Sequence, residues 1–293
     1  MSRFVGSGVA LVTPFNASGI DLNTLDQLLD WHLEQGTDAI VVAGTTGEAS
    51  TLTLEERTLL FEHTVKRVNG RIPVIAGTGS NNTQQAISLS KHAETCGVDG
   101  LLIVTPYYNK CTQRGLVEHY SSIAKAVNLP IILYNVPSRS GVNLLPRTVL
   151  ELSHVENIVG IKEASADITQ IMELFRMVPE DFNVYSGNDD HIFPLLALGA
   201  KGVISTVANL IPKSVHELVT TFVQGDLSSS KKIQHQINPL VKAIFSEVNP
   251  IPVKAGVKLL GFAVGDVRLP LTSAEASTID AIRQELANLE GVL

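Results

Sequence analysis

Eight short aliphatic runs, separated by longer amphipathic runs, are the feature of this 293-residue sequence that most restricts its fold. Each run is continuously apolar, which is typical of parallel strands covered on both faces, rather than alternating between apolar and polar residues. Helical segments with a 3.6-residue apolar spacing fall between the runs, for example over residues 21–36 and 54–68. The predicted strands are 8–14, 39–48, 73–79, 100–106, 130–137, 157–164, 182–189 and 202–209.

Three joints between a predicted helix and the next strand repeat one pattern. The segments QGTDAIVVAG, CGVDGLLIVTP and LGAKGVISTVA each contain a glycine, two further residues, a small residue and then an apolar run. Glycine adopts positive φ readily, so it ends a helix and turns the chain into the following strand. Three such joints, in a chain that alternates strand and helix eight times, favour a closed (β/α)8 TIM barrel of the α/β class over an open sheet.

The sequence after the eighth strand reads differently. Residues 226–293 show only helical patterns, interrupted by NPIPVK at 249–254 and RLPL at 268–271. No stretch rich in Gly, Ser or Pro separates this part as an independent unit. We therefore expect a catalytic barrel over residues 1–225 and a C-terminal helical region, 226–293, packed on the barrel as an appendage.

Composition excludes several classes of protein. The formal net charge of −7 argues against a nucleic-acid binder, whose contact surface would be basic. No apolar run approaches the roughly 20 residues that span a bilayer, and the N-terminus lacks a signal-peptide pattern, so we expect a cytoplasmic protein. The eight histidines are not paired at metal-ligand spacing, and Cys96 and Cys111 form no cluster, so no metal site is expected.

Polar residues gather where the predicted strands end. In a barrel of this type, the active site lies at the carboxyl ends of the strands. The polar residues at those ends are Thr13, GTTGE (44–48), TPYYN (105–109), YNVPSRSG (134–141), Lys162 and Glu163, SGND (186–189), and Ser205 and Thr206.

Lys162 is the most informative of these residues, because it directly follows an apolar run. Strand alternation places Gly160 and Lys162 on one face and Val159 and Ile161 on the other, so Lys162 would point into the barrel mouth. Burial there favours the neutral amine, a nucleophile that captures a carbonyl substrate as a Schiff base. The alternative is a strand-end lysine whose charged head reaches solvent.

Neighbouring strand ends offer groups that suit this chemistry. A Schiff-base lysine needs a proton shuttle, and Tyr134 lies one strand away at the same height, although a buried tyrosine can also be a packing residue with one hydrogen bond. The GTTGE turn offers two hydroxyls and closely spaced N–H groups, which suit a carboxylate. It lacks the Gly-Lys-Ser/Thr ending of a phosphate-binding loop, so nucleotide binding is unsupported. Arg139 has the planar fork that holds a second carboxylate bidentately.

Together, GTTGE, TPYYN, YNVPSRSG, GIKEAS and NPIPVKAG resemble the dihydrodipicolinate synthase family, in order and over essentially the whole chain. This family is a branch of the pyruvate-dependent class I aldolases that includes N-acetylneuraminate lyase. The resemblance implies a carbon–carbon lyase or synthase of the hydro-lyase class. It would condense pyruvate, held as a Schiff base on Lys162, with L-aspartate 4-semialdehyde in diaminopimelate and lysine biosynthesis. It implies no metal and no organic cofactor.

The same resemblance assigns residue roles. Lys162 matches the Schiff-base lysine, and Tyr134, Thr46 and Tyr108 match the proton relay. In the family the last of these tyrosines comes from the neighbouring subunit, which implies at least a dimer. The expected assembly is a homotetramer built as a dimer of dimers, with a dimer as the alternative. The residues matching substrate-binding positions are Thr45 and Thr46 for the pyruvate carboxylate, Arg139 for the semialdehyde carboxylate, and Gly187 and Ile204 as lining positions.

Two other functions remain open at this point. A sugar-acid aldolase, of the N-acetylneuraminate lyase or 2-keto-3-deoxygluconate aldolase type, would use the same amine. Neuraminate lyases resemble one another in having an apolar residue in place of Arg139 and a serine in place of Thr45, so this chain favours the synthase. A non-catalytic, ligand-sensing barrel is the third reading, because a fold does not fix a function, but the lysine, tyrosine and threonine set is intact.

The resemblance weakens at the position of the family's lysine effector site. Lysine-inhibited members have a histidine and a glutamate where this chain has Leu54 and Gln85. Leucine makes no side-chain hydrogen bond, and Gln85 carries no charge to pair with an ammonium, a contact worth about 1.5–3 kcal/mol. Weak or absent lysine inhibition is the resulting hypothesis. Cys111 also departs from the family, which commonly has proline there, and receives no function. The possible effector residues are Ala49, Ser50, Leu54, Asn81, Gln85 and Tyr107.

Overall fold

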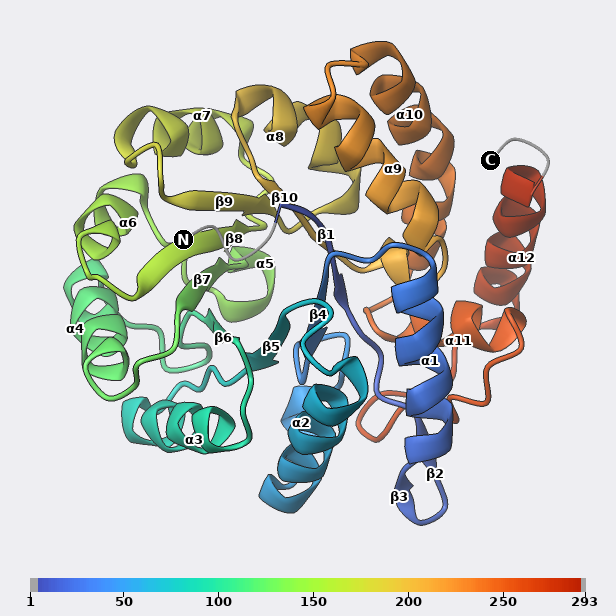
Figure 1. Ribbon diagram of the computed structural model, residues 1–293, viewed down its shortest axis with the longest axis horizontal. Coiled ribbons are helices and arrows are strands. Elements are labelled where there is room, and N and C mark those ends of the chain that lie inside the picture. Colours follow the sequence, from blue (N-terminus) through green and yellow to red (C-terminus); the bar gives the residue numbers. More distant parts are fainter. Residues whose placement is uncertain (1–4, 291–293) are drawn as a thin grey trace.

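Eight parallel strands close into a barrel in the computed structural model, which describes residues 5–290 (Figure 1). The strand order around the barrel is β1-β10-β9-β8-β7-β6-β5-β4, and β1 closes it by pairing with both β10 and β4. The predicted TIM barrel with C-terminal helices is thereby confirmed. The barrel strands are β1 Gly6–Ala10, β4 Ala39–Val42, β5 Val74–Gly77, β6 Gly100–Val104, β7 Ile131–Asn135, β8 Ile158–Glu163, β9 Asn183–Ser186 and β10 Gly202–Ser205.

The first strand ends earlier than its apolar run predicts. The run at 8–14 is buried throughout, but β1 stops at Ala10, because Val12 donates its backbone N–H to the side chain of Asn209 instead of to a strand partner. The chain then forms a small hairpin outside the barrel, with strands β2 Phe15–Asn16 and β3 Gly19–Ile20. Thr13 is therefore a loop residue rather than a strand end.

Helices cover the outside of the barrel (Figure 1). All three glycine joints behave as predicted, since Gly36, Gly97 and Gly199 have φ values of +82°, +82° and +111°. The helices are α1 Leu22–Glu34, α2 Leu54–Val68, α3 Thr83–Thr95, α4 Gln113–Ala124, α5 Pro137–Ser140, α6 Pro146–Ser153, α7 Ile168–Met177, α8 Ile192–Leu198, α9 Pro212–Val223, α10 Leu227–Ile244, α11 Ile251–Leu259 and α12 Ala276–Glu290.

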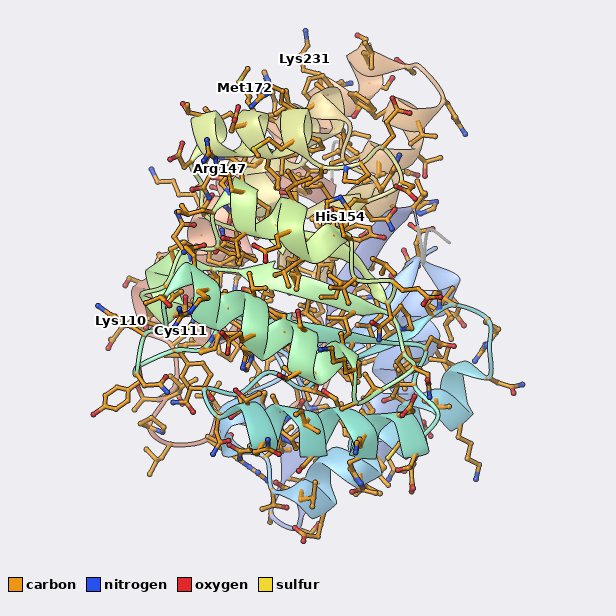
Figure 2. The ribbon with its side chains drawn as sticks, turned by 90° about the vertical axis from the view of Figure 1, so that its left-hand side faces the viewer. Lys110, Cys111, Arg147, His154, Met172 and Lys231 are labelled. Carbon is orange, nitrogen blue, oxygen red and sulfur yellow. The ribbon has the colours of Figure 1, made fainter. Side chains whose placement is uncertain are left out.

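The apolar core has two parts. Ile161 of β8 belongs to the larger part, between the strands and the surrounding helices. Ile204 of β10 and Tyr134 of β7 belong to the smaller part, inside the barrel. Figure 2 shows the helices running alongside the strands, with Arg147 and His154 near the two ends of α6. The loop that carries Lys110 and Cys111 lies on the side where α6 begins, which is the side of the carboxyl ends of the strands.

The part of the chain after residue 225 that the structure describes consists of α10, α11, α12 and their connections, with no strand. Helix α10 packs against α9 and α12, and α11 packs against α12, so this region lies along one side of the barrel (Figure 1). The division at 225/226 stays a prediction, and residues 1–4 and 291–293 of the two predicted units lie outside the described residues. Within residues 5–290, no helix has the length and apolarity needed to cross a membrane.

Candidate active site

Lys162 and Tyr134 stand side by side on paired strands. Strand β7 pairs with β8 so that Tyr134 lies opposite Lys162. Only 5% of Lys162 and 8% of Tyr134 are exposed, and the lysine Nζ lies 4.6 Å from the centre of the tyrosine ring. Both residues line a cavity of about 200 Å³ at the barrel mouth. The amine therefore lies in a nearly closed site beside the tyrosine, rather than in bulk solvent.

The alternation predicted along β8 is only partly correct. Ile161 packs outward under the helices as expected, but Val159 packs against the apolar cluster inside the barrel. The cause is a register shift, because Ile131 pairs with Ile158 whereas the next residue, Ile132, pairs with Gly160. One extra residue in β8 reverses the faces below it. Lys162 keeps its inward direction because it lies beyond this irregularity.

The turn 44–48 brings two hydroxyls into the same cavity, since Thr45 and Thr46 both line it. The residues on either side of its GTTG core, Ala43 and Glu48, have φ values of +51° and +56°. Such a left-handed backbone is unfavourable for residues other than glycine, so surrounding contacts must hold it. One such contact is the bond of 2.8 Å from the Thr13 hydroxyl to the carbonyl of Gly47.

Glu48 is held by residues from the far end of the chain. Its Oε1 accepts a bond of 2.7 Å from Nζ of Lys254, and its Oε2 accepts one of 2.8 Å from the backbone N–H of Arg268. Both charged side chains of the Glu48–Lys254 pair are almost fully buried. Burial lowers the pKa of Lys254, and the bond to Glu48 acts in the opposite direction. The guanidinium of Arg268 pairs with Glu56, which ties α2 to the same region.

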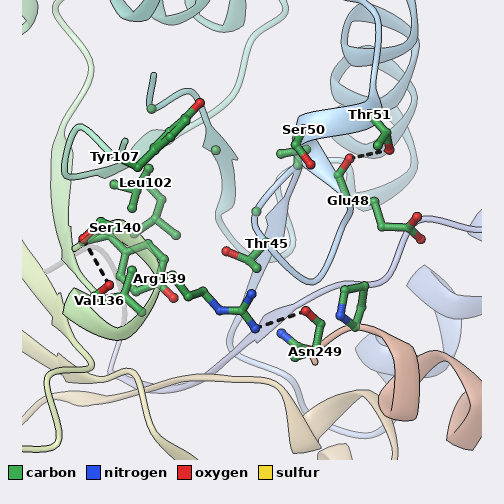
Figure 3. A pocket seen from close by; sticks show the side chains of 18 of the residues that line it. Thr45, Glu48, Ser50, Thr51, Leu102, Tyr107, Val136, Arg139, Ser140 and Asn249 are labelled. Carbon is green, nitrogen blue, oxygen red and sulfur yellow. Dashed lines mark hydrogen bonds between the residues drawn. The ribbon is translucent and has the colours of Figure 1, made fainter. Parts of the chain in front are cut away.

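Arg139 and Asn249 meet across the cavity. The short helix α5 places Arg139 above the barrel mouth, where its Nη2 donates a bond of 3.1 Å to the carbonyl of Asn249 (Figure 3). The side-chain Nδ2 of Asn249 donates a bond of 3.0 Å to the hydroxyl of Thr46. The sequence analysis did not single out Asn249, Lys254 or Arg268. Asn249 and Lys254 lie in NPIPVKAG, one of the motifs of the family resemblance, and RLPL, which contains Arg268, interrupts the helical pattern, but neither segment indicated a role for these residues.

The remaining predicted substrate and relay residues, Gly187, Ile204 and Tyr108, lie in three different surroundings. Gly187 lines the cavity with Lys162, whereas Ile204 is fully buried inside the barrel and is not among the lining residues. Tyr108 does not enter the cavity of its own chain, since it is 91% exposed on the loop after β6 and has a φ of +71°.

The predicted effector residues differ in whether they line a cavity. A second cavity, of about 290 Å³, shares Thr45, Tyr134, Arg139 and Asn249 with the first. Of the predicted effector residues, Ala49, Ser50 and Tyr107 line this second cavity, whereas Leu54, Asn81 and Gln85 do not.

Arg57 lines the second cavity as well, although the sequence analysis did not name it. Its guanidinium donates to the carbonyls of Gly77 and Ala49, at 3.0 and 2.5 Å, and burial lowers its pKa. Its position four residues into α2 gave no local pattern by which to find it.

Behind the catalytic candidates, a buried polar cluster joins β7 and β8. Glu163 is 2% exposed and accepts bonds from the Asn135 side chain at 3.0 and 3.3 Å and from the Ser165 N–H at 2.6 Å. Burial raises the pKa of Glu163. Asn135 also donates to Asn143, which exchanges bonds with Gln170. This cluster ties together the strand ends that carry Tyr134 and Lys162.

In chemical terms, the site offers an amine, a phenol, two hydroxyls and a guanidinium around one small cavity. Such a set can capture a small oxo acid covalently and move protons around it. Among residues 5–290, no three His, Cys, Asp or Glu side chains gather in a way that could hold a metal ion.

Comparison with known proteins identifies the family. The sequence model of the Dihydrodipicolinate synthetase family matches residues 3–289. The 4-hydroxy-tetrahydrodipicolinate synthase of Thermoanaerobacter sp. (strain X514) is 52% identical over 288 residues, which cover 98% of this chain and 97% of the relative. The synthase of the same name from Alkaliphilus oremlandii (strain OhILAs) is 54% identical over 272 residues, covering 93% and 94%.

Solved structures agree. A crystal structure of dihydrodipicolinate synthase from Thermotoga maritima has a TM-score of 0.97 and 45% identity, covering 99% of this chain and 100% of that chain. The chloride-inhibited dihydrodipicolinate synthase from Acinetobacter baumannii, complexed with pyruvate, has a TM-score of 0.95 and 44% identity, covering 99% of each chain. With a family match over nearly its whole length and relatives above 50% identity, this chain belongs to the dihydrodipicolinate synthetase family.

Proposed function

We propose that the chain condenses pyruvate with L-aspartate 4-semialdehyde to form 4-hydroxy-tetrahydrodipicolinate. Family membership makes the chain an enzyme of the class I aldolase type, and its curated relatives carry the name of this activity. The observation that carries the proposal is the buried Lys162 amine, 4.6 Å from the Tyr134 ring, in a cavity that also contains Thr45, Thr46 and Arg139.

The first half of the proposed reaction takes place on pyruvate. The neutral Nζ of Lys162 attacks the keto carbon, and the resulting carbinolamine loses water to give an iminium. Loss of a methyl proton then gives an enamine. Each step moves a proton, and the Tyr134 phenol and the Thr46 hydroxyl are the nearby groups that can carry it. The hydroxyls of Thr45 and Thr46 and the N–H groups of their turn bind the pyruvate carboxylate.

The second half forms the new carbon–carbon bond. The enamine carbon attacks the aldehyde carbon of the semialdehyde, whose oxygen takes a proton to become a hydroxyl. The semialdehyde's own amine, once deprotonated, attacks the iminium carbon, which closes the ring and releases Lys162. No external oxidant or reductant is needed, and the proposal includes no cofactor. Arg139 binds the semialdehyde carboxylate with its planar fork.

We also propose that a second copy of the chain completes the site with its Tyr108 and that the copies assemble as a dimer of dimers. The support is that Tyr108 does not line its own cavity and is 91% exposed. A variant described as the first monomeric dihydrodipicolinate synthase is among the solved relatives, at a TM-score of 0.97 and 44% identity. Sedimentation at several concentrations tests the proposed assembly, and Tyr108→Phe is the matched variant. A fully active monomer would contradict the proposal that a second copy completes the site.

Borohydride trapping tests the catalytic proposal directly. After incubation with pyruvate and reduction, the peptide that contains Lys162 should gain the mass of a reduced pyruvate adduct. Lys162→Ala should gain none, and another buried lysine, Lys254, provides the internal control, because its amine is held by Glu48. An adduct on any other residue, or none at all, would refute the proposed mechanism.

The second substrate is tested by comparing aldehydes. Wild-type protein should turn over L-aspartate 4-semialdehyde far faster than N-acetylmannosamine or glyceraldehyde. Arg139→Ala should raise KM for the semialdehyde by 10-fold or more, an effect on the order of one charge-assisted hydrogen bond, while trapping of pyruvate continues. Preference for a sugar aldehyde would point instead to a sugar-acid aldolase.

Weak or absent inhibition by lysine stays a prediction, as does a cytoplasmic location. In support of the former, Leu54 is half exposed and neither it nor Gln85 lines the second cavity. Inhibition by sub-millimolar lysine in a steady-state assay would show the prediction to be wrong.

A further inference from the structure

Asn249 contacts both halves of the proposed site. Its Nδ2 donates to the hydroxyl oxygen of Thr46 at 3.0 Å. Its backbone carbonyl accepts from Nη2 of Arg139 at 3.1 Å (Figure 3). Only 6% of Asn249 is exposed, and it lines both cavities at the barrel mouth. It lies between α10 and α11, more than 200 positions from Thr46 along the chain.

The direction of the Asn249–Thr46 bond decides what Thr46 can do. A hydroxyl has one proton and two acceptor lone pairs. Because the Asn249 amide occupies a lone pair, the hydroxyl proton of Thr46 remains available for another acceptor. Thr46, Tyr134 and Lys162 line one cavity, so that acceptor can be the phenol oxygen or the carboxylate of bound pyruvate.

A second observation separates Asn249 from an ordinary packing residue. Its Oδ1 is buried and has no hydrogen-bond partner among residues 5–290. Buried side-chain polar atoms are satisfied in the large majority of cases, and leaving one unpaired costs about 1–3 kcal/mol. The buried amide of Asn183, by comparison, serves the sheet by donating to the Val159 carbonyl. Asn249 instead uses its donor on a site hydroxyl and leaves its acceptor unpaired.

We propose that Asn249 is a positioning residue that sets the direction of the Thr46 hydroxyl proton and, through its carbonyl, the reach of Arg139. One residue of the C-terminal helical region thus aligns the proton relay for pyruvate with the clamp for the second substrate. This inference rests on the proposed function and adds to it. The two effects are separable, because substitution of the side chain leaves the carbonyl that receives Arg139 in place.

A double-mutant cycle between Asn249 and Thr46 tests the inference. Asn249→Ala should lower kcat about 10-fold, on the order of one buried hydrogen bond, while KM for the semialdehyde changes less than about 2-fold. In a Thr46→Val background the same substitution should have almost no further effect on kcat, because the hydroxyl that it orients is absent. If the effects of Asn249→Ala and Thr46→Val on kcat multiply in the double variant, the inference is overturned, because Asn249 then acts independently of Thr46.

Asn249→Asp distinguishes the amide donor from the volume of the side chain. The carboxylate has the same shape but cannot donate, so Asn249→Asp should have a kcat as low as Asn249→Ala or lower. Retention of wild-type kcat by Asn249→Asp would overturn the inference. Asn157→Ala is the matched control, because the Asn157 amide donates to carbonyls of Ala124, Val127 and Leu129, away from both cavities. It should lower the melting temperature and leave kcat unchanged.

Pyruvate trapping on the wild-type protein keeps this inference apart from the function on which it rests. If Lys162 is trapped normally and Asn249→Ala has wild-type kcat, the inference is overturned and the proposed function stands. If wild-type Lys162 forms no adduct, both are overturned.

Discussion

The β7–β8 strand pair and the turn 44–48 form two halves of one site, but different forces hold them in place. On the strand pair, Tyr134 and Lys162 are aligned by the register of the sheet, and the cluster around Glu163 lies directly behind them. The turn is held by individual polar contacts from Thr13 and, from the far end of the chain, from Asn249, Lys254 and Arg268. Sheet register is shared among many backbone bonds, so it resists single substitutions, whereas the turn depends on a few individual side-chain contacts.

The two halves also differ in how they accommodate a buried carboxylate. Glu48 in the turn has the cation Lys254 beside it, together with the N–H of Arg268. Glu163 behind the strand pair accepts from neutral groups, among them the Asn135 amide and the Ser165 N–H. A buried ion pair holds a segment strongly, but removal of one partner leaves the other charge buried and unpaired. A buried carboxyl group with neutral donors has no such cation, and burial favours its protonated form. The following predictions test this difference.

The largest expected effect is on the turn. Lys254→Met leaves the Glu48 carboxylate buried without its cation, which should cost about 3–5 kcal/mol of unfolding free energy. The double variant Glu48→Gln, Lys254→Met should recover most of this loss, because it removes the uncompensated charge. Urea unfolding of the two single variants and the double variant measures both effects. Equal losses in the single and double variants would mean that the charge pair does not hold the turn.

A smaller effect is expected on the strand side. A Cβ on Gly187 would lie 2.7 Å from Cβ of Ala164 and 3.1 Å from Cε of Lys162. Gly187→Ala should therefore cost about 1–3 kcal/mol through overpacking and slow pyruvate trapping by displacing the lysine. In the turn, Gly44 has no atom within 4 Å of an added Cβ, so Gly44→Ala should unfold at the same urea concentration as wild type. The comparison fails if both variants are equally destabilised.

The smallest expected effect is the pH dependence of Glu163. Burial raises its pKa above the ordinary value of 4.5, so the folded state binds this proton more tightly than the unfolded state does. The resulting stability is fully present below pH 4.5 and is lost as the pH rises through the folded-state pKa. Relative to Glu163→Gln, wild type should therefore lose unfolding free energy as the pH rises above 4.5. Urea titrations over this pH range measure the difference, and a constant difference would show that Glu163 is not perturbed.

The difference between the strand pair and the turn 44–48 also explains which features could be predicted from the sequence. Continuous apolar runs and glycine joints are local signals, so the barrel, its helices and the positive φ of Gly36, Gly97 and Gly199 followed from them. The neighbouring positions of Lys162 and Tyr134 followed from the barrel order and strand periodicity. The register shift at Ile131 and Ile132 has no signal in the sequence. The face of β8 on which Val159 lies was therefore predicted wrongly.

The contacts on the turn could not be predicted in the same way. Asn249, Lys254 and Arg268 lie 203, 206 and 220 positions from their partners in the chain. No spacing rule relates residues so far apart, and nothing in the sequence around them indicated which residues they contact. The family resemblance assigned roles to the threonines of the turn and to Arg139. It included the NPIPVKAG motif but gave no role to Asn249 or Lys254 within it.

Because the contacts on the turn come from the end of the chain, the order of synthesis matters. All eight barrel strands precede Asn249, Lys254 and Arg268 in the chain and are therefore translated first. A nascent barrel can thus pair its strands while Glu48 still lacks the groups that hold it. We expect the turn that carries Thr45 and Thr46 to take its final arrangement only after translation has passed residue 268.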